Sequence, residues 1–179
     1  MLSMKSNIFN LIFSLFLLNG LFLNILNAQN INDYQKPNVI IIYADDLGYG
    51  DLSFMGATKV NTPNIDKLAE GGCVFTDAHS VSAVCTPSRY ALLTGQYPFR
   101  INNFAPVFCQ NGLIIDTSLT TLPYIFKEYG YQTACIGKWH LGFGAQRPDW
   151  NGALKPGPLE LGFDYYFGVD VPNWPPYCF

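Results

Sequence analysis

The chain has 179 residues, of which 49% are hydrophobic and 13% charged, and its formal net charge is −3. This length and composition suit one domain with a proper core. The weak negative charge and the lack of a basic run argue against nucleic acid as the main partner.

The first residues have the layout of a secretory leader. A lone Lys5 precedes an apolar run from Ile8 to Leu26, and Ala28 stands before a polar stretch. We therefore expect a signal peptide at 1–28, a short linker at 29–36, and a secreted or periplasmic protein. The alternative is an uncleaved membrane anchor, but asparagines and a glycine interrupt the run, so no stable membrane span is expected after cleavage.

Strands and helices alternate in the remainder of the chain. The β-branched run 38–44 predicts a strand buried on both faces, and strands are also expected at 73–81 and 131–137. Capping residues and helical spacing predict helices over 62–71, 85–95 and 122–130. The tail from Arg147 is rich in Pro and Gly and is expected to be loop. Such alternation predicts an α/β sandwich with a largely parallel sheet, whose ligands collect outside the carboxyl ends of the strands.

Two adjacent acids, Asp45 and Asp46, follow the first predicted strand. Side by side they repel each other, and a hard cation with oxygen ligands removes that repulsion most easily. An isolated acidic pair is otherwise a helix cap or a solvated turn. The buried strand that leads directly into the pair favours the metal interpretation.

Four further residues with useful chemistry follow strands or open a helix. Cys85 begins a predicted helix, whose N-terminus favours a thiolate, and Arg89 lies one turn later on nearly the same face. Cys85 is one of five cysteines, an odd number, so it is a disulfide half, a core residue, a nucleophile or a precursor. Lys138 and His140 lie two apart on an extended segment, and with Arg89 they suit a tetrahedral oxyanion.

Three motifs in order resemble the N-terminal part of formylglycine-dependent type I sulfatases of the arylsulfatase kind. They are NVIIIYADDLGYGDL, CTPSRYALLTGQYPFR and GYQTACIGKWHLG. The resemblance implies an alkaline phosphatase-like fold, a three-layer α/β/α sandwich around a largely parallel mixed sheet. It also implies that 37–179 is the N-terminal part of a longer catalytic domain, inactive by itself. Gln96 departs from the Arg or Lys that many relatives have after LTG.

The resemblance also implies an origin for the nucleophile. A maturation enzyme that recognises Thr86, Pro87 and Ser88 would oxidise Cys85 to formylglycine. One hydroxyl of the hydrated aldehyde would attack sulfur, and the other would re-form the aldehyde and release sulfate.

The remaining roles are implied by the same motifs. Asp45 and Asp46, together with the group formed from Cys85, would bind a divalent cation, Ca²⁺ rather than Mg²⁺. Arg89 would hold the hydrated formylglycine and Lys138 would bind the sulfate. His140 would assist proton transfer.

Several alternatives stay open at this point. The substrate is expected to be a sulfated small molecule or a sulfated polysaccharide. A phosphodiesterase or phosphonate hydrolase of the same superfamily would carry similar motifs, because sulfate and phosphate are nearly isosteric. A non-catalytic, secreted carbohydrate-binding relic would have lost Cys85, Asp45 or Lys138, which are all present.

Overall fold

A computed structural model describes residues 36–171, and the chain divides into two units, 1–43 and 44–179. The predicted signal peptide lies outside the described residues. Among the residues that are described, no helix has the length and apolar character needed to cross a membrane.

The sheet of the second unit consists of two parallel strands in the described residues. Strand β1 (Ala134–Lys138) pairs with β2 (Tyr165–Val169), and Lys138 lies opposite Val169. The pairing continues beyond both strands, because the amide of His140 donates to the carbonyl of Asp170 at 2.7 Å. The segments after β1 and β2 therefore leave the sheet side by side, at its carboxyl edge.

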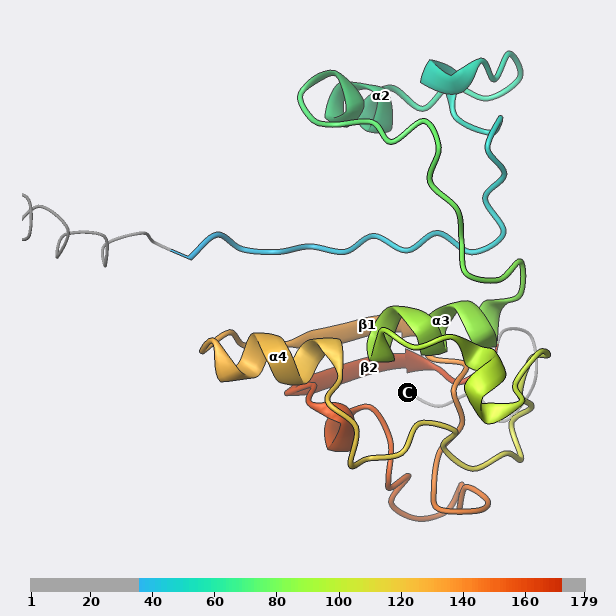
Figure 1. The fold of residues 1–179 in the computed structure, drawn as a ribbon, viewed down its shortest axis with the longest axis vertical. Coiled ribbons are helices and arrows are strands. Elements are labelled where there is room, and N and C mark those ends of the chain that lie inside the picture. Colours follow the sequence, from blue (N-terminus) through green and yellow to red (C-terminus); the bar gives the residue numbers. More distant parts are fainter. Residues whose placement is uncertain (1–35, 172–179) are drawn as a thin grey trace, which may run out of the picture. The chain divides into compact units, whose positions relative to one another are not determined.

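Three α-helices lie where their sequences predict, each within two residues of the expected ends. Helix α2 (Pro63–Glu70) has Thr62 as its N-cap and a proline in its first turn. Helix α3 (Cys85–Thr94) ends at Gly95, whose φ of 65° is the left-handed conformation that stops a helix without a steric cost. Helix α4 (Leu122–Glu128) contacts α3, and the two helices lie alongside the strands in Figure 1.

The core of this unit lies around the segment that follows β1. Trp139 is 2% exposed, and its indole nitrogen donates to the carbonyl of Gly142 at 2.9 Å. Gly142 has no room for a side chain, because a β-carbon there would collide with the carbonyl of Gly112. The core residues are Tyr90, Ile115, Trp139, Leu141, Phe143 and Leu161. Burial of these large side chains fixes the path of the chain directly after β1.

Three predictions about strands were wrong. Residues 38–44 form no strand, and Ile40 and Ile42 are both 83% exposed. Their apolar run signals a preference for burial in a sheet, but within the described residues only β1 and β2 supply a ladder. Residues 73–81 also form no strand, and β2 lies in the tail that was expected to be loop.

A buried leucine of the core provides a test of this packing. Leu161, in the short 3₁₀-helix η4 (Leu159–Leu161), is fully buried, whereas Leu159 of the same turn is 46% exposed. We expect Leu161→Ala to lower the free energy of unfolding by about 2–5 kcal/mol, because it leaves a cavity. Leu159→Ala should change it by less than about 1 kcal/mol. Urea denaturation of the purified protein measures both, and equal losses would contradict the assigned core.

Candidate active site

Three charged side chains meet at the carboxyl end of β1. The Nζ of Lys138 lies 2.8 Å from Oδ2 of Asp45, and an NH2 nitrogen of Arg89 lies 3.5 Å from Oδ1. The hydrogen bond from Lys138, more than any other contact, lowers the pKa of the Asp45 carboxyl. Both cationic side chains are only 13% exposed, so their attraction to the carboxylate is less screened than on an open surface. Asp45, Arg89 and Lys138 therefore lie together at this edge of the sheet.

Helix α3 is fastened to the segment after β1 by two of its own side chains. Arg89 donates from NH1 to the carbonyl of Lys138 at 2.6 Å. Thr86 is fully buried and donates its hydroxyl to the carbonyl of His140 at 2.8 Å. The same hydroxyl accepts the amide of Val107 at 3.1 Å. These bonds bring Cys85, the first residue of the helix, into the neighbourhood of His140 and Lys138.

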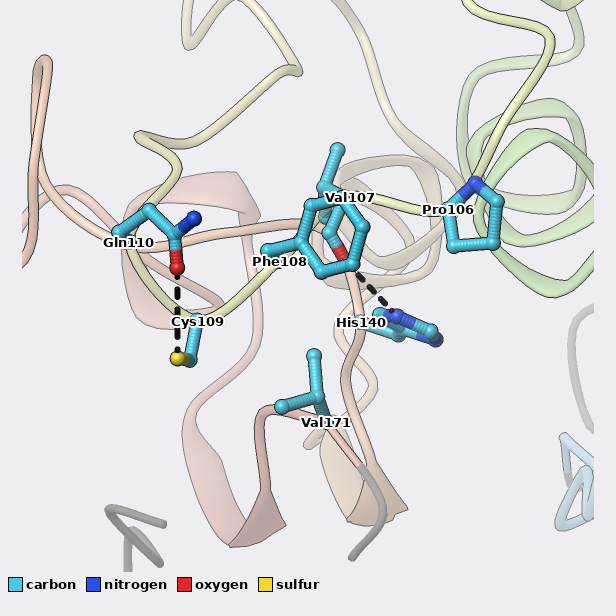
Figure 2. A pocket seen from close by; sticks show the side chains of 7 residues that line it. All are labelled: Pro106, Val107, Phe108, Cys109, Gln110, His140 and Val171. Atoms are coloured by element: carbon cyan, nitrogen blue, oxygen red, sulfur yellow. Dashed lines mark hydrogen bonds between the residues drawn. The ribbon is translucent and has the colours of Figure 1, made fainter. Parts of the chain in front are cut away.

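A hydrogen bond to the backbone defines the tautomer of the His140 imidazole. Its Nε2 lies 2.9 Å from the carbonyl of Val107, as Figure 2 shows. A carbonyl only accepts hydrogen bonds, so Nε2 carries the proton and donates. Burial, more than the charge of Lys138, lowers the pKa of His140, and the ring is neutral near pH 7. Nδ1 then holds a lone pair, and it is buried without a hydrogen-bond partner among the described residues.

Two of the predicted site residues have a left-handed backbone. Asp46 has φ 54° and His140 has φ 59°. Non-glycine residues adopt this conformation at a cost and gather at functional sites. At His140 it also ends the alternation of a strand, so the two-residue spacing from Lys138 does not by itself fix the direction of the imidazole.

The acidic pair fits part of a cation site. Carboxylate oxygens are ligands that a hard cation prefers, and those of Asp45 pair with the Lys138 ammonium and the Arg89 guanidinium in this structure. Asp46 is adjacent and exposed. Residues 36–171 contain no group of three or more His, Cys, Asp and Glu side chains that would enclose a metal ion. The described residues thus supply two carboxylates, and Cys85 is not grouped with them.

Cys85 is a free cysteine in the described part of the chain. Of the alternatives that the sequence left open, the structure therefore does not show it as a disulfide half. The residues after it are buried, at 0% exposure for Thr86 and 7% for Ser88. Ser88 donates to the carbonyl of Ser82 at 2.6 Å. The segment that the resemblance assigns to the maturation enzyme is therefore also part of the packed structure.

One buried acid was missed by the sequence analysis. Asp170 is 1% exposed, and neither carboxyl oxygen finds a well-formed hydrogen bond in the described residues. Burial raises its pKa from the ordinary 3.8 to about 6, and the amide of Gly142 offsets only part of that effect. No sequence signal marked it, because it directly follows β2, a strand in a segment that was expected to be loop.

Comparison with known proteins gives a consistent result. The Sulfatase family profile matches residues 37–178. The N-acetylgalactosamine-6-O-sulfatase of Bacteroides thetaiotaomicron is 51% identical over 144 residues, which cover 80% of this chain and 28% of that protein. Arylsulfatase H of Canis lupus familiaris is 42% identical over 142 residues, covering 75% of this chain and 25% of the relative.

The chain is also similar to a solved structure. That structure comes from work on the metabolism of multiple glycosaminoglycans by Bacteroides thetaiotaomicron, and it superimposes on this chain with a TM-score of 0.74 at 51% identity. The match covers 77% of this chain and 30% of that one. The predicted alkaline phosphatase-like α/β fold is confirmed by this likeness. The chain spans less than a third of the length of each protein named here.

The buried acid leads to a prediction about stability and pH. Above pH 6 the folded protein must hold the Asp170 carboxylate in the core, whereas the unfolded chain solvates it. We expect Asp170→Asn to raise the free energy of unfolding at pH 8 by on the order of 1–3 kcal/mol, because the neutral amide removes this cost. The gain should decline as the pH falls from about 6 and vanish below about 4, where both states are protonated.

Asp164→Asn is a matched control with the opposite sign. Asp164 pairs with Lys127 at 2.7 Å and accepts the amide of Thr133 at 2.9 Å, and these contacts lower its pKa. Its replacement should therefore destabilise the protein near pH 7. Urea denaturation from pH 4 to pH 8 measures both variants. A destabilised Asp170→Asn at pH 8 would contradict an uncompensated buried carboxylate.

Proposed function

The chain belongs to the sulfatase family, and from this premise we propose that it carries the nucleophile side of an active site that hydrolyses a sulfate ester. The observation that supports this most directly is the convergence at one sheet edge. Asp45, Arg89 and Lys138 are joined by ion pairs and hydrogen bonds. The start of α3, with Cys85, is tied to His140 through Thr86.

The nucleophile would be formed from Cys85. Formylglycine at this position would supply a hydrated aldehyde, with one hydroxyl to attack sulfur and a second to expel sulfate afterwards. Cys85 is the first residue of α3, so a developing negative charge there faces the positive end of the helix. This placement favours an anionic group at residue 85.

Positive charge for the sulfate oxygens would come from Lys138 and Arg89. Both belong to rigid elements, β1 and α3, and Arg89 also holds the carbonyl of Lys138. Asp45 and Asp46 would hold a divalent cation, Ca²⁺ rather than Mg²⁺, which neutralises the charge of the sulfate group. The group formed from Cys85 would supply a further ligand.

His140 would accept a proton at its Nδ1 atom. Its Nε2–H is committed to the carbonyl of Val107, and the neutral ring leaves Nδ1 as an acceptor. Such an acceptor suits removal of the hydroxyl proton during release of sulfate. Burial lowers the pKa of His140, which favours this neutral form at neutral pH.

The substrate we propose is a glycosaminoglycan-type sugar sulfated at O6 of N-acetylgalactosamine. The support is the 51% identity to a protein named for that activity.

The leader expected at 1–28 would direct export of the enzyme out of the cytoplasm, where such polysaccharides are found. The maturation enzyme would act before this segment folds, because Thr86 and Ser88 are buried in the structure.

The first test concerns Cys85. The full-length protein is co-expressed with a formylglycine-generating enzyme, and the peptide that contains Cys85 is weighed after digestion. We expect a mass loss of about 18 Da, from –CH₂SH to –CHO, together with sulfate release from 6-sulfated N-acetylgalactosamine. Cys85→Ala should abolish both. An unmodified thiol and no hydrolysis would contradict the proposed chemistry.

The second test concerns the acidic limb of the pH–rate profile. Because the pKa of His140 is below 6.5, the limb of kcat that reports its protonation should lie on the acid side of pH 6.5. His140→Gln should lower kcat by about 10²–10⁴-fold and remove that limb. A variant that kept both the rate and the limb would show that another group accepts the proton.

A further inference from the structure

A pocket of about 390 Å³ lies beside His140, apart from the charged cluster around Asp45. It is lined by the loop 106–110, by His140 and by Val171, as Figure 2 shows. This volume falls within the range of small-molecule sites. The pocket therefore has room for a group about the size of one sugar ring.

The wall of the pocket includes His140, which is 6% exposed. Its Nε2 donates to the carbonyl of Val107, another residue of the lining, at 2.9 Å. This hydrogen bond joins the loop 106–110 to the segment after β1, so the two sides of the pocket are held together.

The rest of the lining selects the kind of ligand. Val107, Phe108 and Val171 are apolar, and Phe108 is 58% exposed, so the face of its ring is available. Gln110 accepts the thiol of Cys109 on its carboxamide oxygen, at 3.6 Å, which directs the amide nitrogen to the other side. Among the described residues, no charged side chain contributes to the lining. The pocket thus suits a neutral, amphipathic ring, whereas a sulfate group suits Lys138 and Arg89.

We propose that this pocket is the subsite for the sugar ring of the sulfate ester, an N-acetylated hexosamine, with Phe108 as the stacking surface and Gln110 as the hydrogen-bonding group. The inference rests on the proposed function and deepens it, because it separates the two halves of the substrate. The sulfate end lies with the charged cluster, and the carbon-bound hydrogens of the ring lie on Phe108. Phe108 and Gln110 are then residues that determine specificity.

Phe108 variants of the full-length, matured enzyme test this proposal. With 6-sulfated N-acetylgalactosamine as substrate, Phe108→Ala should raise KM about tenfold and leave kcat within about twofold, because stacking holds the ring in both ground and transition states. Phe108→Tyr keeps the ring and should restore the wild-type KM. Inhibition by inorganic sulfate, which reaches only the charged cluster, should be unchanged in both variants.

A matched control is Phe99→Ala. Phe99 is 56% exposed and stacks on Tyr97, but it does not line the pocket. A KM in Phe108→Ala equal to that of the wild type would overturn the proposal. A rise of the same size in Phe99→Ala would also overturn it, because the effect would then be a general one.

A binding measurement separates this inference from the proposed function. Neutral N-acetylgalactosamine is titrated into the Cys85→Ala variant and observed by saturation-transfer NMR. Binding that is lost in the double variant with Phe108→Ala supports the subsite even if no formylglycine forms and no sulfate is released. An active wild-type enzyme whose affinity for the neutral sugar does not depend on Phe108 would leave the proposed function standing and remove the subsite.

Discussion

The arrangement of the candidate site depends on two hydrogen bonds between helix α3 and the chain that leaves β1. Arg89 donates to the carbonyl of Lys138, and Thr86 donates to the carbonyl of His140. A buried carbonyl without a partner would be costly, so both bonds are strongly favoured in the folded state. They set the start of the helix against the end of the strand. The position of Cys85, the first residue of that helix, follows from this junction.

Thr86 has a second consequence through Val107. Its hydroxyl accepts the amide of Val107, whose carbonyl in turn accepts the proton of His140. The buried hydroxyl of Thr86 therefore bonds both to the backbone of His140 and to Val107, whose carbonyl orients the imidazole of His140. A short chain of bonds thus connects the residue next to Cys85 with the imidazole of His140, and a loss of Thr86 would disturb both together.

Much of the local structure was predictable, and the errors have a common cause. Helices α2, α3 and α4 carry their own signals, such as Thr62 before Pro63 and Gly95 after α3, and these were predicted correctly. Strands depend on partners far along the chain, so the apolar run 38–44 did not determine whether a ladder forms. The convergence of Asp45, Arg89 and Lys138 was predictable from motifs. The bonds of Thr86 were not, because a backbone carbonyl as acceptor leaves no mark in the sequence.

The lining of the site also divides the chemistry into two regions. The charged side chains Asp45, Arg89 and Lys138 lie in one cluster, whereas the described residues that line the pocket beside His140 contribute no charged side chain. A sulfate ester of a sugar has the same division, with a charged end and a neutral ring. His140 belongs to the pocket wall, and its backbone is tied by Thr86 to the helix that begins at Cys85. In the proposed mechanism His140 would therefore lie between the neutral pocket and the group formed from Cys85, whose hydroxyl needs a proton acceptor during release of sulfate.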